Sequence, residues 1–134
     1  MKVVTNTSSA YEGTYSSLAL TSGQTMTCSA SVRGAVGGEF AQLAIGNSLA
    51  GQAYGSATLT TGWQRINATL TPTASSSGNT LAIRDAGAVA ETFYVDALLC
   101  EQSSSVGSYF DGSSNPPATS WTGTTNDSTS VGPG

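Results

Sequence analysis

The sequence predicts an all-β fold, an antiparallel β-sandwich or jelly roll followed by an extended C-terminal strap. Apolar and polar residues alternate with period two over several stretches, as in half-buried strands. The chain has 21 Ser and 19 Thr, with 16 Gly and few helix-forming residues, which favours strands and turns. Turn signals rich in Gly, Ser and Asn separate the stretches, and no window carries a capped helical pattern.

Five runs carry the strand pattern. The run "TMTCSASVR" places Met26, Cys28, Ala30 and Val32 on one face and hydroxyl groups mainly on the other. "TFYVDALLCE" is apolar on both faces, which predicts a strand that is covered on both sides. "AGQAYGS" reads as a loop. The predicted strands are residues 25–33, 40–46, 63–70, 80–85 and 92–101.

The alternation stops after Glu101, so we assign residues 1–102 to the sandwich and residues 103–134 to the strap. The strap is too polar for a core element, and its "NPP" fixes backbone angles. It nevertheless contains three aromatic residues. We expect these rings to dock on the sandwich or on a neighbouring subunit; they are Tyr109, Phe110 and Trp121.

The charge pattern excludes several classes of protein. The net charge is −4, and the four basic residues form no stripe in the sequence, so we expect no nucleic-acid binding. No apolar run approaches the roughly 18 residues of a membrane span. The beginning of the chain, "MKVVTNTSS", lacks the apolar core of a signal peptide. Few charges with 38% hydrophobic residues indicate a folded protein of an extracellular or virion kind.

Enzymatic chemistry is not expected. The chain has no histidine, which excludes Ser-His-Asp and Cys-His arrangements and histidine metal sites. Its eight acidic residues fall mostly in loops and at strand ends, where solvated carboxylates belong. We therefore expect neither a catalytic site nor an organic cofactor.

Three stretches together carry a resemblance to a known family: "GWQRINATL", "FYVDALLCE" and "SYFDGSSNPPATSWTG". The first two resemble the later strands of jelly-roll carbohydrate-binding modules related to galactose-binding domains. The closing stretch resembles the segment that follows such modules in minor tail proteins of long-tailed bacteriophages. The resemblance covers residues 14–131, and it implies a non-enzymatic virion protein.

The resemblance also implies details of individual positions. Modules of this type begin with strands upstream of the point where this sequence starts, so we expect either that such strands belong to a longer protein or that a sheet edge is left open for another chain to fill. Asp96 corresponds to a position that can help to bind structural calcium, or it accepts hydrogen bonds near the strand end. Trp63 corresponds to a position that packs against the sandwich, and the alternative is that its ring is a platform on which a sugar stacks. We favour hydrogen bonding for Asp96 and packing for Trp63.

Cys28 and Cys100 both fall on inward faces and have no metal-ligand spacing. A virion protein assembled in a bacterial cytoplasm would keep both thiols reduced. We expect two free, buried thiols, with a disulfide bridge as the alternative.

A glycan site can be proposed by elimination. Arg33, Gln42 and Arg84 are polar residues at outward strand positions, and Tyr54 lies in the expected loop, from which its ring could reach over the same face. An aromatic ring flanked by planar hydrogen-bonding groups suits a sugar. Solvated surface or a subunit contact is the alternative interpretation.

The function expected from these observations is that of a bacteriophage virion structural protein, exposed on the particle. As a carbohydrate-binding-module-like domain of a minor tail protein, it would hold host-surface glycans through weak, multivalent contacts. The alternative is a head or tail decoration or cement protein that binds only other virion proteins. A secreted bacterial glycan-binding module is a third, less favoured class. The expected partners are other virion proteins, copies of the same chain in a homo-oligomer, and host glycans.

Overall fold

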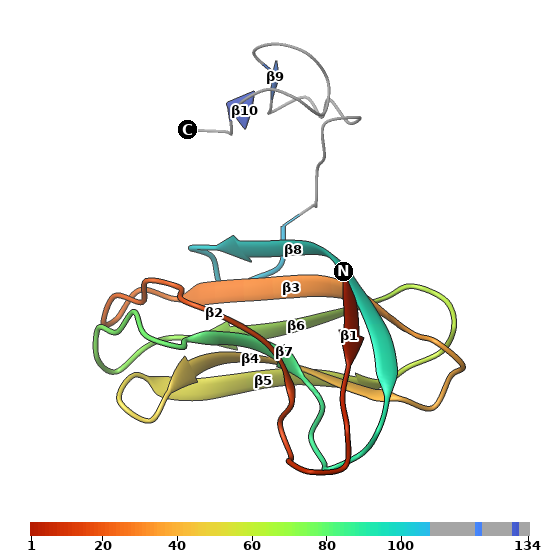
Figure 1. Cartoon of the computed structure of the whole chain (residues 1–134). Coiled ribbons are helices and arrows are strands. Elements are labelled where there is room, and N and C mark those ends of the chain that lie inside the picture. Colours follow the sequence, from red (N-terminus) through yellow and green to blue (C-terminus); the bar gives the residue numbers. More distant parts are fainter. Residues whose placement is uncertain (108–119, 122–129, 132–134) are drawn as a thin grey trace.

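The protein is an all-β sandwich of two four-stranded antiparallel sheets (Figure 1). The computed structural model describes residues 1–107, 120–121 and 130–131, and none of these forms a helix. The first sheet has the strand order β1-β8-β3-β6, and the second has the order β2-β7-β4-β5. The strands are β1 (Lys2–Val4), β2 (Gly13–Ser16), β3 (Met26–Gly34), β4 (Phe40–Asn47), β5 (Gly51–Thr58), β6 (Gln64–Leu70), β7 (Leu81–Arg84) and β8 (Thr92–Glu101).

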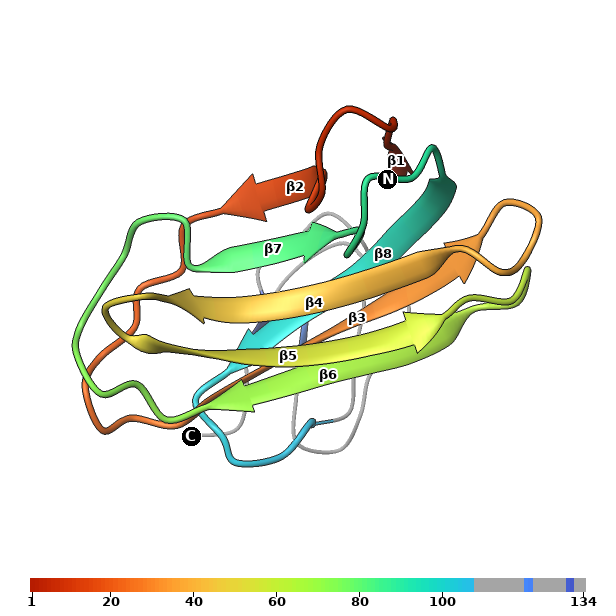
Figure 2. The same ribbon diagram turned by 90° about the horizontal axis from the view of Figure 1, so that it is seen from below.

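The connectivity is that of a jelly roll. Strands β4 and β5 form a hairpin in one sheet, whereas every other connection between consecutive strands from β1 to β8 crosses to the opposite sheet. Figure 2, turned by 90° from Figure 1, shows the strands of the second sheet side by side in the order β2, β7, β4 and β5. The predicted fold class is therefore confirmed.

Two short strands, β9 (Ser120–Trp121) and β10 (Ser130–Val131), pair with each other in antiparallel register. Trp121 thus belongs to a strand, but its side chain is outside the part of the chain that the structure describes in detail. Tyr109 and Phe110 lie outside the described residues altogether. The predicted docking of these three rings stays a prediction.

The core lies between the sheets and follows the predicted alternation. Met26, Cys28, Ala30 and Val32 of β3 are all buried, and the inward positions of β6 in the same sheet and of β4 in the opposite sheet are buried as well. The largest fully buried apolar side chains are those of Phe93, Leu43, Ile45, Leu59 and Ile83. Alternation was sufficient to assign Leu43, Ile45 and Ile83, because one face of each strand packs inward. It did not assign Leu59, which lies outside the predicted strands, or Phe93, which lies in the run that is apolar on both faces.

The loop predicted at residues 50–56 is wrong, since these residues lie in strand β5 or next to its first residue. The inward side of β5 carries only small residues, so the sequence lacks the large apolar side chains that mark a strand. The reason is a close backbone approach: a Cβ atom on Gly55 would lie 1.7 Å from the carbonyl oxygen of Asn67 in β6. Small residues allow the two sheets to meet at this side of the sandwich.

The prediction that β8 is covered on both faces is also wrong. Phe93 and Val95 are buried, but Asp96 is exposed and Leu98 is 45% exposed. The register with β3 shifts near Ala97, whose φ of 50° places it in the left-handed region. This β-bulge changes the faces to which the following side chains point. Apolar residues therefore fall on both faces of β8, although the strand is not covered on both faces.

Cys28 and Cys100 form a disulfide bridge, which corrects the expectation of two free thiols. The two residues are direct register partners in the neighbouring strands β3 and β8, and their Cα atoms are 4.1 Å apart. Alternation showed that both face inward. It could not show that they lie opposite each other, because the register between strands 72 residues apart is a tertiary property.

Candidate functional site

A polar and aromatic cluster occupies the outward face of the second sheet, centred on Arg84 of β7. Gln42 of β4 is the direct register partner of Arg84. Nε and one terminal nitrogen of the guanidinium donate hydrogen bonds of 3.1 and 3.0 Å to Oε1 of Gln42. Both side chains are half-buried, so these bonds fix the orientation of the guanidinium plane.

Two tyrosine rings flank this guanidinium. Its Cζ atom lies 4.5 Å from the ring centroid of Tyr11 and 5.8 Å from that of Tyr54. The rings are 51% and 49% exposed, so each still offers area to a ligand. The hydroxyl group of Tyr54 donates a 2.6 Å hydrogen bond to Oε1 of Gln52, which holds this ring in place.

A second row of side chains lies beside the first. Tyr15 pairs with Ala82, Ala82 with Ala44, and Ala44 with Tyr54, across strands β2, β7, β4 and β5. These residues share one face because register partners in antiparallel strands point to the same side. Two alanines, both buried, therefore separate the two tyrosines.

The hydroxyl group of Tyr15 donates to the carbonyl oxygen of Tyr11, which links the two rows. We call this surface the tyrosine face; its residues are Tyr11, Tyr15, Gln42, Gln52, Tyr54 and Arg84. Chemically, it combines half-exposed rings, on which the apolar side of a ligand can stack, with planar hydrogen-bonding groups that can orient polar substituents.

The structure brings together three of the four predicted glycan-binding residues: Gln42, Tyr54 and Arg84. Tyr54 reaches this face from strand β5 and not from a loop. Arg33 does not join them, because it lies on β3, in the other sheet. Both arginines point outward, but outward positions of the two sheets lie on opposite sides of the sandwich.

Sequence reasoning missed Tyr11 and Tyr15. Strand β2 is only four residues long and carries no apolar alternation, so it gave no strand signal. Tyr11 has a φ of 65°, a left-handed conformation that is uncommon for a residue with a Cβ atom. The spacing of the two tyrosines around Gly13 is the one signal that could have indicated the pair.

Trp63 does not pack into the sandwich as expected, since its side chain is 53% exposed. It lies just before β6, with the Cζ atom of Arg33 5.3 Å from the centroid of its ring. Tyr94 of β8 stacks closer to this guanidinium, at 4.3 Å. Arg33 therefore has aromatic neighbours of its own on the first sheet.

Asp96 lies on the exposed side of β8, where it has a backbone hydrogen-bond partner. Its Oδ1 atom accepts a 2.8 Å hydrogen bond from the backbone N–H of the next residue, Ala97, in the bulge of β8. Calcium requires six to eight oxygen ligands. No group of three or more acidic or other metal-binding side chains occurs in the part of the chain that the structure describes. The hydrogen-bonding interpretation agrees with this geometry.

Two acidic residues are buried, contrary to the expectation of solvated carboxylates. Burial of Glu39 by itself raises its pKa, but hydrogen bonds from backbone N–H groups in the preceding turn outweigh this effect and lower the pKa below its ordinary value. Two of these bonds come from the N–H groups of Val36 and Gly37, each at 2.8 Å. Asp85 is 1% exposed; Oδ1 accepts a 2.8 Å bond from the N–H of Glu12, whereas Oδ2 has no partner among the described residues.

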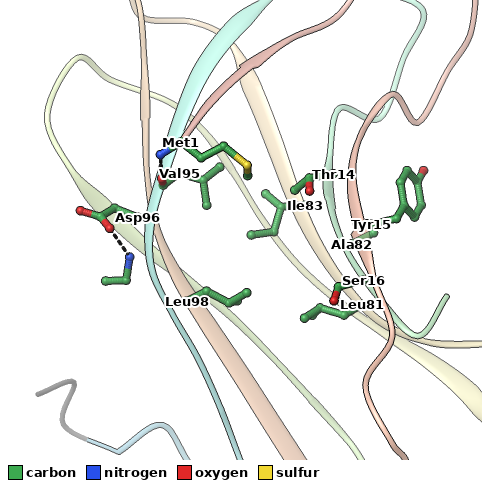
Figure 3. Close-up of a pocket in the computed structure, with 11 residues that line it drawn as sticks. Met1, Thr14, Tyr15, Ser16, Leu81, Ala82, Ile83, Val95, Asp96 and Leu98 are labelled. Atoms are coloured by element: carbon green, nitrogen blue, oxygen red, sulfur yellow. Dashed lines mark hydrogen bonds between the residues drawn. The ribbon is translucent and has the colours of Figure 1, made fainter. Parts of the chain in front are cut away.

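An apolar cleft opens between the sheets on the side of β2, β7 and β8 (Figure 3). Its volume is about 390 Å³, and the side chains of Leu98, Ile83 and Val95 converge on it, whereas the ring of Tyr15 points away. Strand β1 pairs with β8 only at residues 92–94, and the N-terminal amine donates a 2.6 Å bond to the carbonyl oxygen of Val95. Beyond Val95, no strand in the described ranges pairs with this edge of β8.

Comparison of the chain with protein-family models, curated proteins and solved structures gave no match. Among the described residues, no helix is long and apolar enough to cross a membrane.

Proposed function

We propose that this protein is a non-enzymatic glycan-binding module, exposed on a bacteriophage particle as part of the tail. The observation that carries the binding proposal is the tyrosine face, on which Arg84 is fixed by Gln42 between the rings of Tyr11 and Tyr54. The assignment to a phage tail depends on the sequence resemblance.

The chemistry of the tyrosine face suits a sugar. The C–H side of a pyranose ring is apolar and stacks on an aromatic ring, whereas its hydroxyl groups need donors and acceptors in the plane around it. Tyr15 and Tyr54 provide rings on either side of two alanines. Arg84, Gln42 and Gln52 provide the polar groups.

Such a shallow, open face would bind one sugar weakly. Display of several copies on one particle converts weak contacts into strong adhesion, because later contacts are effectively intramolecular. The disulfide bridge supports exposure of the module outside the reducing cytoplasm, since disulfides persist in oxidising surroundings.

The test is a glycan array that includes bacterial wall and capsular polysaccharides, followed by titration of the best neutral ligand. We expect Tyr54→Ala to weaken binding about five- to tenfold, on the scale of one aromatic contact. Tyr54→Phe is the matched control, because it keeps the ring and removes only the bond to Gln52. Equal affinity of the wild type and Tyr54→Ala, or no retained glycan, would contradict the proposal.

A decoration or cement protein is the second candidate, and the open edge of β8 above the apolar cleft favours it. An extended segment of another virion protein could add a strand beside residues 96–101 and place alternate apolar side chains over Leu98 and Ile83. Cryo-electron microscopy of the intact particle separates the two. A tail-tip position with the tyrosine face open to solvent supports adhesion, and burial of that face against other subunits supports decoration.

A further inference from the structure

The outward face of the first sheet carries a row of alternating cationic and aromatic side chains. Lys2 of β1 is the register partner of Tyr94 in β8, and Tyr94 is the partner of Arg33 in β3. Gln64 pairs with Val32, so Trp63, the preceding residue, lies next to Arg33. We call the row Lys2, Tyr94, Arg33 and Trp63 the cationic strip. It crosses all four strands, over about 14 Å at the usual strand spacing.

Arg33 is held rigidly but has its hydrogen-bond donors available. Its guanidinium stacks 4.3 Å from the ring centroid of Tyr94 and 5.3 Å from that of Trp63. Within residues 1–107, the guanidinium donates no hydrogen bond and forms no ion pair. Arg84 differs, because two of its nitrogen atoms are already bonded to Gln42.

A half-buried arginine whose guanidinium has no acceptor among residues 1–107 is an unusual arrangement in a protein whose other arginines have hydrogen-bond partners. The two rings cover the face of the guanidinium and leave its edge, where the N–H groups point, for a planar or tetrahedral oxyanion. The ammonium group of Lys2 adds a second positive charge in the same row, on an exposed side chain.

The chemistry that best complements this row is a polysaccharide with carboxylate or phosphate groups. Anionic groups would meet the guanidinium and the ammonium, while sugar faces would stack on the exposed ring of Trp63, which is 53% exposed. The acid that lies closest in register on this face is Asp96, in the neighbouring row, and its carboxylate is bonded to the N–H of Ala97. A nucleic acid fits less well, since its binding depends on neutralising many closely spaced phosphates and the cationic strip holds two cations.

We propose that the cationic strip is a second binding site, for an anionic polysaccharide, on the side of the sandwich opposite the tyrosine face. The two sites differ in the ligands they select. The tyrosine face suits neutral sugars, and the cationic strip requires negative charge. The second site does not depend on the first.

The experiment is calorimetric titration of the full chain with polygalacturonate and with poly(glycerol phosphate) teichoic acid, and with neutral dextran for comparison. We expect binding to one or both anionic polymers that weakens as salt is raised. Arg33→Ala should reduce this affinity about tenfold or more, as expected for a lost charged hydrogen bond. Trp63→Ala should reduce it about two- to fivefold.

Arg84→Ala is the matched control, because it removes an arginine from the opposite face and should leave binding of the anionic polymer unchanged. Arg33→Lys keeps the charge but loses the planar stack, and it should restore only part of the affinity. Thermal midpoints of all variants separate loss of binding from loss of folding. Equal binding by Arg33→Ala and the wild type, binding of dextran that Arg33→Ala weakens to the same extent, preference for duplex DNA, or no binding of either anionic polymer would overturn the proposal.

The test is independent of the proposed function. Tyr54→Ala should weaken binding of neutral glycans and leave that of the anionic polymers unchanged, whereas Arg33→Ala should do the reverse. If the Tyr54→Ala results contradict the neutral-glycan site, the anionic-polysaccharide site can still hold, and the same is true in the opposite direction for Arg33→Ala.

Discussion

The Cys28–Cys100 bridge gives the most quantitative prediction, because the structure defines the loop that it closes. The two cysteines are 72 residues apart, so the bridge restricts a large part of the unfolded chain. The chain-entropy relation gives a stabilisation of about 4 kcal/mol at 25 °C for a loop of this length. At the usual unfolding entropy of about 2.1 cal/mol/K for each residue, this corresponds to a shift of about 20 °C in Tm for the sandwich.

Reduction is the cleanest perturbation, since it breaks the bridge and leaves both sulfur atoms in the core. We expect urea unfolding, followed by tryptophan fluorescence and circular dichroism, to show a lower midpoint in the presence of a reductant. Cys28→Ala combined with Cys100→Ala should lose more than reduction does, because Cys28 is fully buried and its truncation leaves a cavity.

Two results would refute this reasoning. Alkylation of two thiols in the denatured, unreduced protein would show that the bridge does not form. Coincident urea transitions with and without reductant, for a protein whose bridge is confirmed by mass spectrometry, would show that the entropy argument fails here. Residual structure in the unfolded chain would then be the first property to measure.

Three further predictions concern folding. Glu39→Gln should lower the free energy of unfolding by about 2 kcal/mol near neutral pH, since it weakens bonds from two backbone N–H groups to a buried carboxylate. Because the pKa of Glu39 is lowered on folding, this stability is present above its unfolded pKa of about 4.3 and is lost as the pH falls through the folded value. The urea midpoints of the two proteins should therefore converge in acid, and a constant difference between them would contradict this linkage. Gly55→Ala should cost about 1–3 kcal/mol, because its Cβ atom would lie 1.7 Å from a backbone oxygen; Gly78→Ala, where a Cβ atom meets nothing within 4 Å, is the matched control and should change the urea midpoint little. Phe93→Ala should cost about 3–5 kcal/mol by removing a fully buried ring, and a Tm close to that of the wild type would show that the core between β1 and β3 is packed differently.

The sequence alone was sufficient for the fold class and for much of the core. Period-two alternation depends only on local geometry, in which successive side chains of a strand point to opposite faces. Positions such as Met26, Val32, Leu43 and Ile66 could therefore be assigned to the interior without knowledge of the topology. The pattern failed where local geometry was not regular, at the small-residue strand β5 and at the bulge around Ala97.

The composition of the candidate sites was decided by the tertiary structure. Alternation shows that Arg33 and Arg84 both point outward, but a sandwich has two outward faces, and only the strand order places the two arginines on opposite ones. The register of distant strands places Cys100 opposite Cys28, Gln42 beside Arg84, and Tyr94 beside Arg33. Register and strand order are set by packing of the whole chain, since no short stretch of sequence contains both partners.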